Sequence, residues 1–258
     1  SKNMRLFAYI GRFTLDFLEK LGDFALFCYS ILYWMTRGPV YVSQYFKQME
    51  FIGVKSLSVV LLTGVFTGMV SALQTHYGFS LFGAESLVGS TTTLGLFREL
   101  GPVLASLMVT ARAGSAMTAE IGTMKVTEQV DALTVMGVNP FQYLVLPRIA
   151  ASLIMMPMLA LVFNAIGVAG TYLVGVVFLD IDRGVFMAKI ADYVYLSDLT
   201  TGLTKAVCFG LILSTVGCYK GYGTTGGAEG VGKSTTGSVV ISSVSILIAD
   251  YFLTAVMY

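Results

Sequence analysis

The sequence predicts an all-α integral membrane protein with an N-terminal interfacial helix, five transmembrane helices and a cytoplasmic coupling helix between the second and third spans. Of its 258 residues, 55% are hydrophobic and only 12% are charged, whereas soluble domains carry about 25% charged residues. Apolar stretches near the roughly 20 residues needed to cross a bilayer recur along the chain. One polar, periodic segment, residues 120–137, interrupts them and is too polar to cross.

Residues 1–50 form the first of two predicted regions, and residues 51–258 form a single transmembrane domain. In the first region, apolar residues recur at three- and four-residue steps with charges between them, a pattern typical of a helix lying in the membrane interface. They are Leu6, Ile10, Phe13, Phe17, Leu21 and Phe24. Tyr33, Trp34 and Tyr41 are the aromatics expected at headgroup level. We therefore expect an interfacial, elbow-like start to the chain.

The five spans differ in length and in internal features. The first contains Gly64 and Gly68, a spacing that lets helices approach closely in lipid. The third is too long for a hydrocarbon core of about 30 Å, and Pro147 and Pro157 are expected to bend it. His76 is expected in an outer loop or at an interface. The predicted spans are residues 57–73, 88–111, 141–178, 200–219 and 239–258.

The second span carries a charged pair, Arg98 and Glu99. If the span were trimmed to residues 100–111, it could not cross the membrane. Keeping its full length places the pair inside, where charged side chains are costly and are expected to face a cavity or a partner. The alternative is a helix that begins at Arg98, with the pair at the interface.

Basic residues indicate the orientation. Those on the N-terminal side of the membrane are Lys2, Arg5, Arg12, Lys20, Arg37, Lys47, Lys55, Lys125, Arg148, Lys220 and Lys233. The opposite side has mainly Arg183 and Lys189, within an amphipathic segment, residues 180–198. The positive-inside rule places the N-terminus in the cytoplasm and, with five spans, the C-terminus in the periplasm.

Two glycine motifs resemble nucleotide-binding patterns. Residues 227–234 fit GxxxxGK(S/T), and residues 221–226 fit GxGxxG. Both patterns require a strand before and a helix after them in an α/β unit, but here two membrane spans flank them. We therefore expect a flexible, glycine-rich cytoplasmic turn over residues 221–237 that binds no nucleotide.

Catalytic and metal-binding patterns are missing from the sequence. The single histidine has no Ser–His–Asp set around it, and the cysteines Cys28, Cys208 and Cys218 sit in apolar stretches without metal or disulfide spacing. We expect a chain that is not an enzyme, has no cofactor or metal of its own, and binds no nucleic acid.

The segment 120–137 is expected to form one helix along the cytoplasmic face, ended by Gly137 as a C-cap. Such a helix between two spans can pass a push from a soluble ATPase to both spans. The residues expected to contact the ATPase are Glu120, Lys125, Glu128 and Asp131. The alternative is a helix face that only meets solvent.

Several motifs carry a family resemblance. Asp131-Ala-Leu, Gly137 and Leu144-Val-Leu-Pro147 resemble the EAA-glycine-Leu-Pro signature of ABC-importer permeases, with a shorter distance from glycine to proline. More specific are residues 98–103, RELGPV, residues 111–122, ARAGSAMTAEIG, and residues 226–232, GGAEGVG, followed by Ser234-Thr-Thr and Asp250. From about residue 50 to 258, the chain resembles the MlaE family of ABC permeases.

This resemblance implies the permease subunit of an Mla (MCE-type) phospholipid transport system in the inner membrane of Gram-negative bacteria. It implies a homodimer, cytoplasmic ATPases of the MlaF type that hold ATP and magnesium, a STAS-domain protein like MlaB, and a periplasmic MCE hexamer like MlaD. The implied substrate is glycerophospholipid, moved between inner and outer membranes to maintain outer-membrane lipid asymmetry.

A lipid of this kind requires an apolar cavity, expected at the outer half of the dimer interface. Arg98 and Glu99 are expected to line the cavity, and Arg98 could meet a phosphate as a bidentate donor. The residues expected to face acyl chains are Leu73, Tyr77, Leu81 and Leu100. Ordinary packing or lipid contact is the alternative for these four.

Two other functions compete. A stand-alone secondary transporter or channel would use Arg98, Glu99 and Lys205 as an ion path, but it predicts internal repeats that the sequence lacks. A scaffold that only anchors the periplasmic ring would leave the intramembrane charges and the cytoplasmic helix without a purpose.

Overall fold

The computed structural model describes residues 2–37 and 41–257, with side chains except those of residues 2–13, 16 and 17. Helices are its only regular elements over these residues. Five helical segments are long and apolar enough to cross a membrane, as predicted. They are Val42–Ser80, Glu85–Val126, Phe141–Phe178, Leu196–Tyr222 and Gly227–Met257. Four of them are longer than predicted, because the helix continues into flanking residues, and the third has its predicted bounds.

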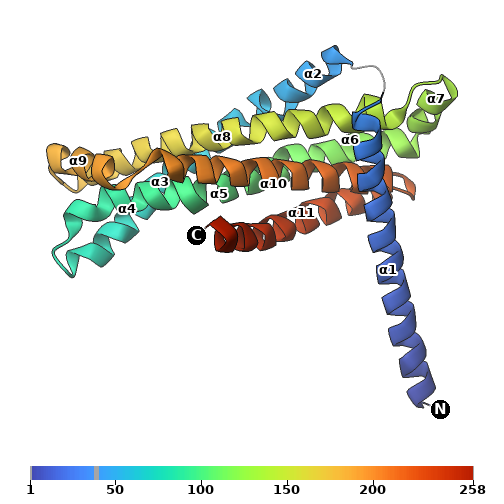
Figure 1. The fold of residues 1–258 in the computed structure, drawn as a ribbon, viewed down its shortest axis with the longest axis horizontal. Coiled ribbons are helices and arrows are strands. Elements are labelled where there is room, and N and C mark those ends of the chain that lie inside the picture. The colour runs from blue at the N-terminus through green and yellow to red at the C-terminus, as the bar shows by residue number, and fades with distance from the viewer. Residues whose placement is uncertain (1, 38–40, 258) are drawn as a thin grey trace.

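The long helices run side by side as a bundle with two distinct ends (Figure 1). α3 (Leu57–Ser80) packs on α8 (Leu146–Tyr172), α8 packs on α10 (Leu196–Tyr222), and α10 packs on α11 (Gly227–Met257). The bundle's two ends, here called the α7 end and the α9 end, are marked by the short helices α7 (Gln129–Val135) and α9 (Arg183–Tyr193). Asp182 caps α9, since its carboxylate accepts the Val185 backbone N–H at 2.8 Å.

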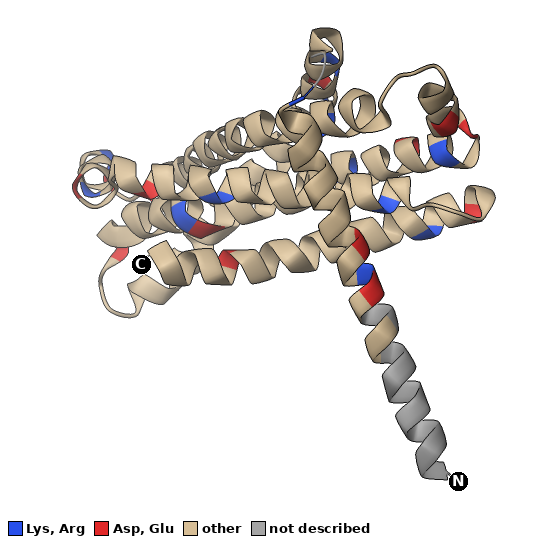
Figure 2. Cartoon of the chain, turned by 45° about the vertical axis from the view of Figure 1, so that its right-hand side comes forward, with Lys and Arg blue, Asp and Glu red and all other residues tan. Residues whose placement is uncertain are grey.

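The core lies where α3, α8, α10 and the second span meet. Its largest fully buried apolar side chains include Leu96, Met156, Phe163, Phe209 and Leu213. Charged residues cluster toward the two ends of the bundle, and long stretches between them carry none (Figure 2). This distribution is the one a bilayer requires, because an ionised group in the hydrocarbon region is costly.

The second span is one uninterrupted helical run of five pieces. Two of them, η3 and η4, are single π-helical turns, which widen the helix by one residue. The run passes through Arg98 and Glu99, so the alternative of a helix beginning at Arg98 is wrong. The pieces are α4 (Val88–Gly95), η3 (Leu96–Leu100), α5 (Gly101–Val109), η4 (Thr110–Gly114) and α6 (Ser115–Val126).

The first and third spans are also composite. α2 (Val42–Ile52) and the 3₁₀ turn η1 (Val54–Ser56) lead into α3. α3 continues to Ser80, so His76 is helical rather than in a loop. A second 3₁₀ turn, η2 (Glu85–Leu87), precedes α4. In the third span, π turns flank α8, which contains Pro157; they are η5 (Phe141–Val145) and η6 (Leu173–Phe178).

α1 (Lys2–Met35) crosses the α7 end of the bundle instead of running along it (Figure 1). Phe27 attaches it to the bundle: its ring lies 5.4 Å from that of Phe141, 5.5 Å from Tyr219 and 6.3 Å from Tyr222. The side chains of Leu6, Ile10, Phe13 and Phe17 lie outside the described residues. An interfacial position for α1 stays a prediction.

The glycine-rich turn between the last two spans is shorter than predicted. α10 runs to Tyr222 and α11 begins at Gly227, so only residues 223–226 connect them. The residues that resemble a P-loop form the first turns of α11. The following turn of α11 packs against the second span, since Ser238 is buried and its hydroxyl oxygen lies 2.9 Å from that of Thr118.

Candidate functional site

A buried ion cluster joins the second, fourth and fifth spans. Lys205 of α10 is fully buried, and its Nζ lies 2.7 Å from Glu99 Oε2 and 3.1 Å from Asp250 Oδ1. The same ammonium donates to the Thr254 hydroxyl at 2.7 Å. The Thr254 hydroxyl oxygen is also 3.2 Å from Glu99 Oε1. Glu99 thus meets a partner, as intramembrane charge predicts, and the partner belongs to the same chain.

The cluster has one positive and two negative groups. An ammonium has three donors, and the three oxygens around Lys205 can use all of them. The Glu99 side chain is 37% exposed and that of Asp250 is 20% exposed, so the two carboxylates reach toward the surface of the chain. Sequence reasoning noted Lys205 and Asp250 but did not pair them. Their opposite signs within neighbouring apolar spans were the available signal.

Arg98 binds the first turn of the same helix, α10, through Asp198. Its Nε and Nη2 both donate to Asp198 Oδ1, at 2.8 and 2.6 Å. The other carboxylate oxygen of Asp198 accepts the Tyr195 backbone N–H at 2.9 Å, which caps the start of α10. The Arg98 guanidinium, which was predicted to donate two hydrogen bonds to a phosphate, therefore donates them to a carboxylate here. A phosphate would have to compete with Asp198.

A cavity of about 400 Å³ opens between α3 and α4, in the half of the bundle toward the α9 end; we call it the outer pocket. Its lining is Val70, Ser71, Gln74, Thr75, Thr91, Thr92, Gly95 and Leu100. Most of these side chains offer neutral hydrogen-bonding groups. Of the six predicted lipid contacts, Leu100 alone lines the pocket.

The other predicted lipid contacts divide into two groups. Leu73, Tyr77 and Leu81 are 49%, 75% and 71% exposed, on the C-terminal part of α3 and the turn after it. Arg98 and Glu99 instead reach α10 and α11 through the ion pairs above. The structure places the apolar contacts on an open surface of α3, separate from the charged pair's partners.

The predicted helix over 120–137 is two helices. α6 ends at Val126, Glu128 adopts a left-handed conformation with φ 59°, and α7 begins at Gln129. Gly137, with φ 76°, follows α7 as predicted for a terminating glycine. The single helix is wrong because the left-handed residue turns the chain, which lets Val130 bury its side chain. We call residues 127–137 the coupling segment.

The four residues predicted to contact an ATPase have different surroundings. Glu128 is exposed at the bend. Lys125 and Asp131 pair at 2.9 Å and hold α7 against the end of α6. Glu120 lies in the second span, where its Oε2 is 2.9 Å from Nη2 of the buried Arg148 at the start of α8. These contacts tie the coupling segment to the second span and the second span to the third.

Sequence reasoning missed two exposed apolar residues of the coupling segment. Val135 is 89% exposed and Met136 is 68% exposed. Side chains exposed to this degree add little to the buried core. The signal was an apolar pair directly before Gly137.

The small residues of 111–122 pack the second span closely against α10 and α11. The side-chain oxygen of Thr118 lies 3.1 Å from the Gly217 carbonyl and 2.9 Å from the Ser238 hydroxyl. A Cβ at Gly221 would lie 2.8 Å from Ile121, so only glycine permits this approach. Displacement of α6 would therefore move both neighbouring spans.

Comparison with known proteins gives a consistent result. A family model described as permease MlaE matches residues 45–256. A probable ABC transporter permease protein of Rickettsia felis is 46% identical over 249 residues, which cover 96% of each chain. The intermembrane phospholipid transport system permease protein MlaE of Haemophilus influenzae is 38% identical over 250 residues, again 96% of each chain.

A chloroplast protein of a plant is also similar to this chain. The chloroplastic protein TRIGALACTOSYLDIACYLGLYCEROL 1 of Arabidopsis thaliana is 38% identical over 222 residues, which cover 86% of this chain and 63% of the plant protein. The family model spans nearly all of the membrane bundle, and the sequence motifs in the second span and at the start of α11 lie within it. The chain belongs to the MlaE permease family.

Proposed function

We propose that this chain is the membrane permease subunit of an ABC transporter that moves glycerophospholipids between the inner and outer membranes of a bacterium. Separate subunits hydrolyse the ATP, and the transport maintains lipid asymmetry in the outer membrane. The observation that carries the proposal is the coupling segment, an exposed apolar turn that one ion pair joins to the second span, which a second ion pair joins to the third. The MlaE protein of Haemophilus influenzae, named for phospholipid transport, supports the substrate.

The α7 end then faces the cytoplasm and the α9 end faces the periplasm, in the inner membrane. The N-terminus is cytoplasmic and the C-terminus is periplasmic. In this frame α1, which crosses the α7 end, lies along the cytoplasmic interface (Figure 1). Lys20, Lys125 and Arg148 are then on the cytoplasmic side, as the positive-inside rule expects.

A second copy of the chain covers α11. α11 is the least buried of the five spans, and a membrane helix held by few contacts within its chain is available for packing with another. Its exposed apolar residues outside the cavity that it lines together with α1 and α10 include Val240, Val244, Leu247, Ile248 and Tyr251. Beyond the dimer, the partners are an ATPase of the MlaF type, a STAS-domain protein like MlaB, and a periplasmic MCE hexamer like MlaD.

The lipid binds at the outer pocket and the adjoining surface of α3. Leu73, Tyr77, Leu81 and Leu100 contact acyl chains, and Gln74 and the threonines of the pocket offer hydrogen bonds to the headgroup. Arg98 and Glu99 precede Leu100 in the second span, and their side chains bind α10 rather than the pocket. Because the pocket's own polar groups are neutral, they do not favour one headgroup charge.

Coupling follows a chain of contacts. Closure of the ATPases pushes on the coupling segment, and the Lys125–Asp131 pair passes the displacement to α6. The Glu120–Arg148 pair carries it to α8, and Thr118 carries it to α10 and α11. The rigid bundle then changes between two packed arrangements, which closes the outer pocket and transfers the lipid to or from the periplasmic ring.

A secondary transporter with an ion path through Arg98, Glu99 and Lys205 has less support. The three residues lie in two separate ion-pair groups, and Lys205 is fully buried between its partners. Family membership also favours the permease.

Replacing Val135 and Met136 together with aspartate is expected to detach the ATPase. The exposed apolar pair is the coupling segment's main contact surface, and two carboxylates there would require desolvation. Copurification of the ATPase with the permease should fall at least about 10-fold, and Glu128→Lys should weaken it less. Met187→Asp, at an exposed apolar position on α9, is the control. Full copurification with the double variant would refute docking at this segment.

Gly95→Leu is expected to block lipid movement. Gly95 lines the outer pocket, and a Cβ there meets nothing within 4 Å, so the leucine fills the pocket without disturbing the helix. In proteoliposomes with the complete complex, ATP-dependent lipid transfer should fall about 10-fold or more while ATP hydrolysis persists. Gly232→Leu, equally open but at the α7 end, should transfer lipid normally. Normal lipid transfer by Gly95→Leu would show that the transported lipid does not bind in this pocket.

A further inference from the structure

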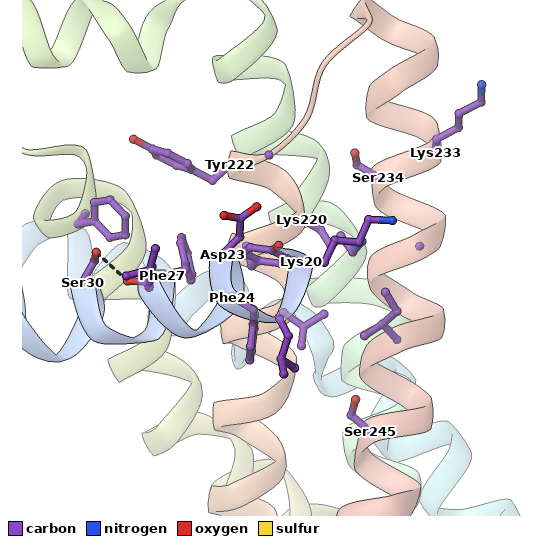
Figure 3. Close-up of a pocket in the computed structure, with 18 residues that line it drawn as sticks. Lys20, Asp23, Phe24, Phe27, Ser30, Lys220, Tyr222, Lys233, Ser234 and Ser245 are labelled. Atoms are coloured by element: carbon purple, nitrogen blue, oxygen red, sulfur yellow. Dashed lines mark hydrogen bonds between the residues drawn. The ribbon is translucent and has the colours of Figure 1, made fainter. Parts of the chain in front are cut away.

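A second cavity lies at the opposite end of the bundle from the outer pocket. It has a volume of about 920 Å³, is open on one side, and is lined mainly by α1, α10 and α11 (Figure 3). Its walls are largely apolar and include Phe24 and Phe27 of α1, Val216 and Tyr219 of α10, and Ile241 of α11. We call it the α1 groove. Its volume is at the upper end of the range of about 300–1,000 Å³ for ligand pockets.

The α1 groove has an excess of positive charge. Lys20, Lys220 and Lys233 line it from three different helices, and Asp23 is the one acidic residue among its described lining (Figure 3). Lys233 pairs with Glu229 at 2.7 Å. Among the described ion pairs, none involves Lys20 or Lys220. Two ammonium groups are thus available beside an apolar cavity, with one carboxylate near them.

The groove has the depth of one lipid leaflet. On α11 its lining extends from Lys233 to Ser245, which is about 18 Å at roughly 1.5 Å per residue. Half of a hydrocarbon core of about 30 Å is about 15 Å. Lys233 stands at the end of this wall nearer the bundle's α7 end, where headgroups meet the surface, and Ser245 stands deeper in the span.

We propose that the α1 groove binds an anionic phospholipid of the leaflet at the α7 end. One acyl chain lies along Phe24, Val216 and Ile241, and the phosphate is held by Lys20 and Lys220. Basic pockets between membrane helices are known to hold anionic headgroups in this way. The lipid fills the space between α1 and the bundle and fixes α1 in the interface. This proposal takes from the proposed function only that the bundle spans a membrane.

The test measures lipid retained by the purified permease complex, without ATP, by native mass spectrometry after detergent exchange. With phosphatidylglycerol and phosphatidylcholine supplied in equal amounts, the wild type is expected to retain phosphatidylglycerol about 10-fold in excess. Lys20→Gln with Lys220→Gln should abolish this preference. Lys47→Gln, on α2 and outside the groove, should keep it.

A second pair of variants tests the groove by its volume. A Cβ at Gly237, which lines the groove, meets nothing within 4 Å, and the same holds at Gly232, which does not line it. Gly237→Leu should therefore expel the lipid, whereas Gly232→Leu should retain it. Because each leucine replaces a helical glycine, both variants are expected to fold.

Three results would overturn the proposal. Equal retention of the two lipids by the wild type would remove the selection by charge. Loss of phosphatidylglycerol in Gly95→Leu, with retention in Gly237→Leu, would place the lipid in the outer pocket. A photo-crosslinker at Ile241 that joins the chain to a second copy or to another protein, and not to lipid, would assign the groove to a protein contact. None of these readouts requires transport, so failure of the proposed function would leave them unchanged.

Discussion

Replacing Lys205 with methionine is expected to unfold or deplete the protein in the membrane. The substitution keeps a long side chain but removes the one positive charge that Glu99 and Asp250 share. Removing one partner of a buried ion pair costs about 3–5 kcal/mol, because the remaining charge is left uncompensated. Here two carboxylates would be left. The thermal midpoint of the detergent-solubilised protein, and its level in membranes, should both fall.

A rescue variant separates charge from packing. Adding Glu99→Gln and Asp250→Asn to Lys205→Met removes the uncompensated charges and should restore most of the stability. Lys233→Met is the control: it breaks a pair whose side chains are 77% and 79% exposed, and exposed pairs contribute about 0–1 kcal/mol. If the triple variant were no more stable than Lys205→Met, the cost would come from shape rather than from charge.

The number of spans could be predicted from the sequence because a bilayer makes strong demands. About 20 apolar residues are needed for each crossing, and five such stretches were evident. The helix ends were less predictable, since the water-exposed ends of these helices are set by packing. The segment 227–237 reads as part of a flexible turn from its glycines, yet it is helical and belongs to α11, which packs against α6 and α10.

The candidate site, too, could be predicted only in part. The sequence indicated that Arg98 and Glu99 had to meet partners, since unpaired charge in a membrane is costly. It could not say which partners, because Asp198 and Lys205 lie about 100 residues further along the chain. The bend at Glu128 was also hidden, since a left-handed glutamate has no sequence signature of its own.

Gly64 and Gly68 illustrate the same limit. Their spacing predicted a close helix contact, and the contact exists, but its partner is read only from the fold. A Cβ at Gly64 would lie 2.7 Å from Ile166, and one at Gly68 would lie 1.9 Å from the Gly167 carbonyl oxygen. Both neighbours belong to α8. The pattern thus identified the face of α3 but not the helix that covers it.

Gly68→Ala is therefore expected to separate α3 from α8 and to destabilise the protein strongly. The obstacle is backbone, which cannot rotate away as a side chain can. The Thr171 hydroxyl also donates near this point, at 3.2 Å to the Gly68 carbonyl and 3.0 Å to the Gly167 carbonyl. Overpacking usually costs 1–3 kcal/mol, so a backbone clash should cost about 3 kcal/mol or more and lower the thermal midpoint.

Gly78→Ala is the matched control on the same helix. A Cβ there meets nothing within 4 Å, and alanine is favoured over glycine in a helix by about 1 kcal/mol. The two identical substitutions on α3 should thus change the thermal midpoint in opposite directions. If both raised it, α3 could move away from α8 at little cost, and the tight α3–α8 contact would not be what holds the first span in place. If the thermal midpoint fell only with Gly68→Ala, the α3–α8 contact would be fixed. The outer pocket between α3 and α4 would then have to open and close while α3 stays packed on α8.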